Sequence, residues 1–226
     1  MDRAHLLPAP HVTGILGGGR WRLLAAVFAG LAALAAVSHS TLLLIDEPLS
    51  ELGRRDWLAA SFRAITTLGG TEIAIGVAVV IAAVLWLRCR TFAVVYPVTL
   101  LVGAVINIGL KELVGRPRPP APDTGVSLAS FPSGHTLQAT LLFGLLPLAV
   151  WLLTQRAVAH RLAVLLSAVA IVAVGVSRVL LGAHWPTDVV GGVLVGLALI
   201  LVAEHVLTVR TSHRHCRCAL ATVSSR

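Results

Sequence analysis

The sequence predicts an all-α integral membrane protein with six transmembrane helices and an additional amphipathic helix in the membrane interface. Three observations lead to this fold class. Of the 226 residues, 57% are hydrophobic and only 12% are charged, whereas soluble domains are about half apolar and about a quarter charged. The apolar residues gather in six segments near the roughly 20 residues that cross a bilayer as a helix. Too few residues remain for a separate soluble domain.

The first expected span covers residues 21–45. It follows an N-terminal stretch, 1–20, that has Pro, Gly and little periodicity, so we expect this stretch to be flexible. The span is too long for a cleavable signal peptide, and no cleavage site of small residues precedes a polar segment. The next segment, 46–70, carries charges between spaced apolar residues, which is typical of a helix lying in the membrane interface. We expect Gly69 and Gly70 to end that helix.

Five further apolar segments complete the six spans, at approximately 71–88, 92–113, 131–154, 160–181 and 187–208. The sequence thus predicts one membrane domain over 21–209, followed by a basic tail at 210–226. The tail contains two cysteines and two histidines within residues 213–218, a set that could bind a soft metal. Its place beside the chain end, with no partner element, favours a disordered tail.

Six spans put both termini on one side of the membrane, and the cations indicate which side. If the termini are cytoplasmic, 11 of the 18 Lys and Arg residues lie inside; those outside are Arg54, Arg55, Arg63, Lys111, Arg116, Arg118 and Arg178. A cytoplasmic excess of Lys and Arg is the usual arrangement in membrane proteins. It also accounts for the net charge of +8 without a nucleic-acid partner. The three cysteines fall on the cytoplasmic side, where free thiols are expected.

Three polar clusters stand at the outer ends of the expected spans. The first reads KELVGRPRP over 111–119, the second FPSGH over 131–135, and the third SRVLLGAHWPTD over 177–188. All three lie on one membrane face in the six-span arrangement. Segments far apart in the sequence are therefore expected to form one pocket.

The cationic side chains of these clusters suit a phosphate group. Lys111, Arg118 and Arg178 are its candidate ligands, because guanidinium groups match phosphate oxygens in pairs and Lys adds a point charge. Ser133 and Gly134 stand where a helix begins, and the free N–H groups at such a terminus favour an anion.

Two histidines supply the reactive groups. His135 and His184 are candidates for proton transfer and for attack on phosphorus. Asp188 follows His184 by four residues and comes within reach of it if a helix begins at Pro186. A carboxylate there would orient the imidazole and stabilise its charged form, as in catalytic triads. The residues together indicate a phosphate-ester site that needs no metal.

These motifs resemble those of the type 2 phosphatidic acid phosphatase superfamily, membrane lipid phosphate phosphatases related to vanadium haloperoxidases and bacterial acid phosphatases. The family pattern is KxxxxxxRP, then PSGH, then SRxxxxxHxxxD, and this sequence meets every required position. The spacing assigns Arg118 to the first motif and leaves Arg116 as a helper. The span arrangement extends the resemblance over about residues 50–205.

The resemblance implies a role for each site residue. His184 would attack phosphorus and form a phosphohistidine, Asp188 would orient it, and His135 would protonate the leaving group. The phosphoryl oxygens would be held by Lys111, Arg118, Ser133, Gly134 and Arg178.

The resemblance also implies a metal-independent lipid phosphatase in the cell membrane, with both termini cytoplasmic and the active site on the extracytoplasmic face. Candidate substrates are undecaprenyl diphosphate, phosphatidylglycerol phosphate, phosphatidate and other polyprenyl phosphates. We expect no cofactor, no nucleic-acid partner and no obligate protein partner.

Two other functions stay open at this point. The same residues would serve a phosphotransferase that passes phosphate to a lipid or sugar hydroxyl instead of water. A transporter or lipid-binding protein would explain Lys111, Arg118 and Arg178 as an anion site, but not His135 or the spacing of His184 and Asp188. Each residue alone is ordinary for a helix end; their joint occurrence favours the enzyme.

Overall fold

The computed structural model describes residues 59–120 and 129–211, with side chains to residue 207, and scattered positions between 23 and 48. Every regular element among these residues is helical, apart from an isolated bridge between Pro117 and Ala129 and a bridge position at Cys89. The all-α prediction is therefore confirmed for the described part of the chain. The N-terminal stretch, most of the first expected span, and the tail beyond residue 211 lie outside it.

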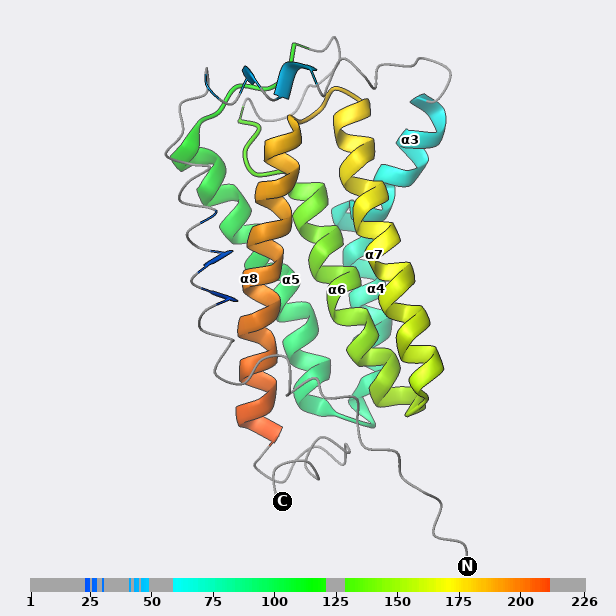
Figure 1. Ribbon diagram of the computed structural model, residues 1–226. Helices are drawn as coiled ribbons and strands as arrows, with labels where there is room; N and C mark the ends of the chain where they lie inside the picture. The colour runs from blue at the N-terminus through cyan, green and yellow to red at the C-terminus, as the bar shows by residue number, and fades with distance from the viewer. Residues whose placement is uncertain are drawn as a thin grey trace, which may run out of the picture.

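The helices run in chain order as an elongated bundle (Figure 1). Their bounds are α3 Ala59–Thr66, η2 Thr67–Gly69, α4 Thr71–Trp86, α5 Arg90–Val114, α6 Gly134–Thr154, α7 Ala157–Leu180 and α8 Pro186–Thr211. Within the described residues, α5 to α8 are each long and apolar enough to cross a membrane. The pair Ala59–Gly69 and Thr71–Trp86 would form a fifth span, bent by 45°. Six spans thus remain a prediction.

The bend lies at the glycine pair that the sequence marked as a helix end. A Cβ on Gly69 would lie 2.5 Å from the carbonyl oxygen of His135 and 2.8 Å from Cγ1 of Val174, so only glycine fits against α6 and α7 here. Gly70 is extended, with φ −72° and ψ 149°, and interrupts the helix. Whether α3 lies in the membrane interface remains a prediction.

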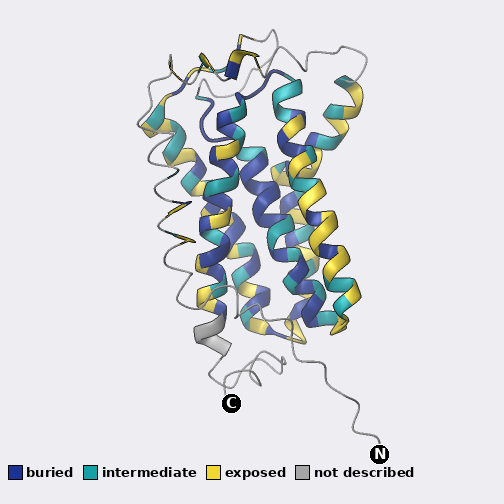
Figure 2. Ribbon diagram, in the orientation of Figure 1, coloured by how far each residue is buried: buried dark blue, intermediate teal, exposed yellow. Residues whose placement is uncertain are grey.

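Helix α6 forms the centre of the bundle (Figure 2). It contacts α4, α5, α7 and α8, and its inner face is lined by Leu137, Leu141, Leu142 and Leu145, all at most 1% exposed. By contrast, α7 exposes apolar side chains along most of its length. That exposed surface suits contact with lipid, because apolar groups facing hydrocarbon need no cover.

Small residues let α8 approach α6 closely. A Cβ on Gly192 would lie 2.7 Å from the carbonyl oxygen of Ser133, and one on Gly196 would lie 2.6 Å from Cγ2 of Thr140. Small residues at helix interfaces are the common means of close packing in membranes. This contact holds the start of α8 beside the start of α6.

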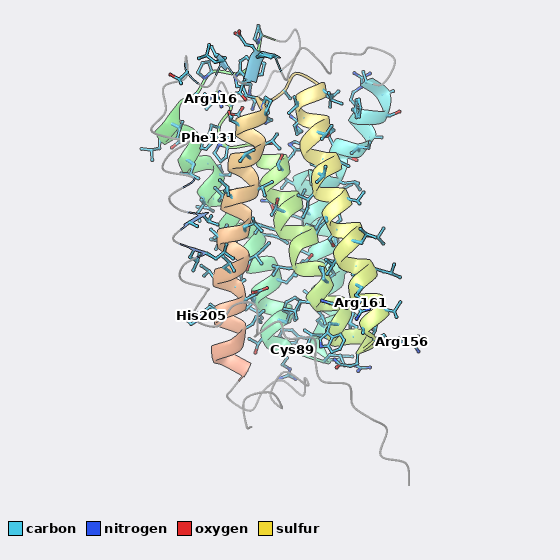
Figure 3. The ribbon with its side chains drawn as sticks, in the orientation of Figure 1. Cys89, Arg116, Phe131, Arg156, Arg161 and His205 are labelled. Carbon is cyan, nitrogen blue, oxygen red and sulfur yellow. The ribbon has the colours of Figure 1, made fainter. Side chains whose placement is uncertain are left out.

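The two ends of the bundle differ in character (Figure 3). Arg116 and Phe131 lie at one end, together with the loops that carry the three motifs, while Cys89, Arg156 and Arg161 lie at the other. Cys89 is disulfide-bonded, so the expectation of free thiols is wrong for this residue.

Candidate active site

A cavity of about 370 Å³ opens where the three motifs meet. Ligand sites commonly have volumes of about 300–1,000 Å³. Of the residues predicted from the sequence, six line the cavity: Lys111, Arg118, Gly134, His135, Arg178 and His184. The topology therefore gathers three cations and two histidines around one space. Asn107 and Gln138 also line it.

The cations of the first motif are placed by the end of α5. Lys111 lies in its last turn, and Gly115 ends the helix with a left-handed φ of 59°, a conformation that favours glycine. The Lys111 Nζ donates to the carbonyl of Ala129 at 3.0 Å, and Arg118 Nη1 donates to the carbonyl of Ala183 at 2.8 Å. These bonds tie the loop after α5 to the second and third motifs.

Arg178 is placed by the end of α7. Its Nη1 donates to Oγ1 of Thr66 at 3.1 Å, and its Nε is buried without a partner among the described residues. Its carbonyl accepts the backbone N–H groups of Ala183 at 3.0 Å and His184 at 3.2 Å. The chain thus folds back at Gly182, whose φ is 64°, and brings His184 beside Arg178.

The start of α6 presents backbone groups to the cavity. The Ser133 side chain is fully buried, accepts a bond from Oγ1 of Thr136 at 3.0 Å, and does not line the cavity. Its N–H donates to the carbonyl of Asp188 at 3.0 Å. Its backbone is extended, with φ −68° and ψ 113°, so α6 begins at Gly134 and not at the predicted residue 131. Gly134 opens the helix at the cavity, where free N–H groups favour an anion.

His184 and Asp188 form the pair that the spacing predicts. His184 Nδ1 lies 3.5 Å from Oδ2 of Asp188, a separation slightly beyond a relaxed hydrogen bond. Such contacts are often long before substrate binds. The same Oδ2 accepts the N–H of Trp185 at 2.9 Å, and Asp188 is fully buried. With Nδ1 facing the carboxylate, Nε2 is the ring nitrogen available to a ligand.

The surroundings of His184 favour the neutral imidazole. Burial lowers its pKa to about 4; the Asp188 carboxylate opposes this change, and the charges of Arg178 and Arg118 add to it. Burial also lowers the pKa of Arg118, against the charge of Asp188. At neutral pH, His184 therefore carries a free lone pair beside a cationic pocket. That combination suits attack on an anionic phosphorus centre.

Sequence reasoning named Arg116 only as a helper and missed the second layer that it forms with Asp46 behind Asp188. Arg116 is only 4% exposed and does not line the cavity. Its Nη1 donates to Oδ1 of Asp188 at 2.7 Å and to Oγ1 of Thr187 at 2.6 Å. Its Nη2 donates to Oδ2 of Asp46 at 2.5 Å. An acidic residue just after the first apolar run was the available signal, but only the fold brings Asp46 to this site.

Trp185 shapes the same region. Its ring is 5.9 Å from the guanidinium of Arg116, and its Nε1 donates to the carbonyl of Pro117 at 3.1 Å. Within the described residues, no group of three or more His, Cys, Asp or Glu side chains is arranged to hold a metal ion. The groups that face the cavity suit a phosphate anion.

Known proteins share this architecture. The family model of the PAP2 superfamily matches residues 92–212, more than half of the chain and all three motifs. Phosphatidylglycerophosphatase B of Bacillus subtilis (strain 168) is 30% identical over 179 residues, which are 75% of this chain and 87% of the relative.

Two solved structures are similar in fold. The crystal structure of a transmembrane PAP2 type phosphatidylglycerolphosphate phosphatase from Bacillus subtilis matches with a TM-score of 0.72 and 29% identity, covering 80% of this chain and 94% of that one. Aquifex aeolicus LpxE matches with a TM-score of 0.50 and 20% identity over 74% of this chain and 93% of its own. The second likeness concerns the fold alone.

Proposed function

The chain belongs to the PAP2 superfamily and is a membrane lipid phosphatase of that family, and we propose that it acts through a phosphohistidine on His184. The observation that carries this proposal is the shared cavity. It joins three cations with His135 and a neutral His184, and a buried carboxylate lies behind His184. An anion site alone would need the cations but not this histidine–carboxylate pair.

In the proposed reaction, Lys111, Arg118 and Arg178 bind the phosphoryl oxygens. His184 Nε2 attacks phosphorus, the bond to the lipid oxygen breaks, and His135 in its protonated form gives a proton to that oxygen. Asp188 stabilises the charge that develops on the His184 ring. Water then attacks the phosphohistidine, His135 takes a proton from that water, and the bond between phosphorus and Nε2 breaks to release inorganic phosphate and free His184. The cations neutralise the charge of the transition state, so we propose turnover without a metal.

The first substrate to test is phosphatidylglycerol phosphate. The relative that is 30% identical is a phosphatidylglycerophosphatase, and this similarity supports the choice. Phosphatidate, undecaprenyl diphosphate and another polyprenyl phosphate complete the panel. We propose that the reaction occurs at the extracytoplasmic face of the cell membrane, since the cation distribution favours cytoplasmic termini.

The test measures phosphate release by the purified protein in detergent with a chelator present. Wild type is expected to release phosphate from at least one lipid of the panel and to form an acid-labile, base-stable phosphoenzyme. His184→Ala should lose both. His205→Ala, at an exposed position of α8, makes the same change outside the cavity and should keep both.

Three results would contradict parts of the proposal. Full turnover by His184→Ala would exclude this histidine as the nucleophile. Label that passes from the lipid to an added alcohol, with no free phosphate, would indicate a phosphotransferase. Binding of the lipids without turnover or phosphoenzyme would indicate a lipid-binding protein.

A further inference from the structure

Asp46 is buried beside the site although it lies far from the three motifs in the sequence. It is fully buried. Its Oδ1 accepts the N–H of Thr187 at 3.0 Å, and its Oδ2 accepts the Thr187 hydroxyl at 2.6 Å. The same Oδ2 accepts Nη2 of Arg116 at 2.5 Å. The segment before α3 is thereby tied to the first turn of α8, which carries Asp188.

One guanidinium is shared between two buried carboxylates. Arg116 Nη2 pairs with Asp46, and its Nη1 pairs with Oδ1 of Asp188 at 2.7 Å. Buried charges interact strongly, and a buried charge without an opposite partner lowers the stability of the fold. The three groups together carry one negative charge. A carboxylate at Asp46 therefore balances Arg116, which would otherwise neutralise Asp188.

This balance matters because Asp188 must act on His184 as well. Its Oδ2 faces His184 Nδ1 while its Oδ1 is bound by Arg116. The more fully Arg116 neutralises Asp188, the less negative charge remains to stabilise a positive His184 ring. On the basis of the proposed function, we propose that Asp46 and Arg116 are positioning residues. Together they hold Asp188 in place and set the negative charge that it presents to His184.

The other charged groups near His184 stay constant in the test. They are Asp188 on α8, Arg178 on α7, Arg118 on the loop after α5, Lys111 on α5 and His135 on α6. Changes at residues 46 and 116 alter only the second layer. A change in the protonation of His184 then reports the charge of that layer.

The experiment measures labelling of His184 by diethyl pyrocarbonate, which reacts with unprotonated imidazole. Mass spectrometry of the modified peptide gives the labelling rate. The labelling ratio is the rate at pH 4 divided by the rate at pH 7. In Asp46→Asn, Arg116 neutralises Asp188 more fully, which disfavours the charged ring of His184, so this ratio should rise. Arg116→Gln removes the cation and leaves two carboxylates, so the ratio should fall. The double variant should return toward wild type.

Activity provides a second measurement. Each single variant should lower kcat by about tenfold to a hundredfold, the range typical of residues that orient a reactive group from behind, with KM changed by less than about threefold. The kcat of the double variant should exceed that of either single variant. Independent losses that multiply in the double variant would overturn the inference.

Two variants separate the effect of charge on His184 from the effect of a structural change alone. Thr187→Val removes the hydroxyl that bonds to both Asp46 and Arg116 and changes no charge. It should lower the unfolding temperature and leave the labelling ratio unchanged. Arg116→Lys keeps the charge and should also keep the labelling ratio. If Asp46→Asn fails to fold, the comparison of Arg116→Lys with Arg116→Gln still tests the inference.

Ratios that move in the same direction in Asp46→Asn and Arg116→Gln, or an equal shift in Thr187→Val, would overturn the inference. Labelling requires no substrate. The inference can therefore fail while the wild type is an active phosphatase, and the proposed function can fail while the labelling ratios behave as expected.

Discussion

His184 is held between groups that change its pKa in opposite directions. Burial and the cations of the pocket lower the pKa, while the Asp188 carboxylate raises it. The histidine is therefore neutral when the site is empty, yet a carboxylate is ready when attack on phosphorus makes the ring positive. A nucleophile of this kind avoids the loss of reactivity that an ordinary histidine suffers as it protonates near pH 6.5.

The pH at which His184 loses its reactivity toward a labelling reagent should reflect this lowered pKa. The pKa of His184 is lowered to about 4, so the ring stays unprotonated from neutral pH down to about pH 5 and gains its proton near pH 4. The rate at which diethyl pyrocarbonate labels His184 should be constant from pH 8 to about pH 5. It should fall to about half near pH 4. Half-maximal labelling near pH 6.5 would contradict the structure.

The role proposed for His135 depends on the leaving group. A lipid alkoxide needs a proton as it departs, whereas a nitrophenolate does not. His135→Gln should lower kcat on a lipid phosphate by about a hundredfold to ten-thousandfold, the usual contribution of a general acid. Its kcat on p-nitrophenyl phosphate should change little. Equal losses on both substrates would show that His135 serves binding or structure instead.

At the scale of elements, the site depends on helix ends that glycines bring together. The α7–α8 turn reverses at Gly182 with a φ of 64°, and the α3–α4 bend brings Gly69 against the start of α6. Each junction fixes a reactive side chain: His184 follows the first, and His135 lies at the second. Glycine is favoured at the first junction by the positive φ of Gly182 and at the second by the lack of room for a Cβ on Gly69.

Gly69 lines the cavity without contributing a reactive side chain, so substitution there should disturb the site through packing alone. A Cβ there would lie 2.5 Å from the His135 carbonyl oxygen, so Gly69→Ala must displace α6 or the bend. We expect a loss of about 1–3 kcal/mol in stability, as overpacking typically causes, and a lower kcat. Gly76→Ala on α4 is the matched control, because a Cβ there would meet nothing within 4 Å.

Thermal unfolding in detergent and phosphate release measure these two effects. Gly76→Ala should retain activity and unfold at or slightly above the wild-type temperature, since alanine favours a helix interior. Unchanged stability and activity in Gly69→Ala would show that the contact between the bend and α6 is not required.

The whole molecule separates its charges between two ends. The motif loops with Arg116 lie at one end of the bundle, and Arg156 and Arg161 lie at the other (Figure 3). The apolar surfaces of α4, α5 and α7 extend between these ends. This arrangement lets a lipid keep its tail in the membrane while its head group reaches the cavity.

The membrane orientation can be tested with exposed positions at the two ends. In a background with all three native cysteines replaced by Ser, Glu112→Cys near the cavity should react with an impermeant maleimide in intact cells. Arg156→Cys at the opposite end should react only after lysis. Both positions are exposed. The reverse pattern would place the active site at the cytoplasmic face and contradict the orientation inferred from the cations.

Much of this protein could be read from its sequence, because the membrane restricts the possible folds. Continuous apolar segments must become helices in hydrocarbon, and the bounds predicted for α5, α7 and α8 agree with the structure within about three residues. The spacing of Lys111, Arg118, His135, Arg178, His184 and Asp188 was enough to predict a phosphate site, since local spacing along a chain needs no tertiary information.

Other features of the site depend on tertiary structure and cannot be predicted from the spacing of residues along the chain. The angle between α3 and α4, the burial that lowers the pKa of His184, and the placement of the Ser133 side chain outside the cavity all follow from contacts between distant segments. The contact between Asp46 and Arg116 spans 70 positions, and no local pattern encodes so distant a pairing. The sequence determined which groups the site contains; packing of the helices decided which of them face the substrate and which hold the others in place.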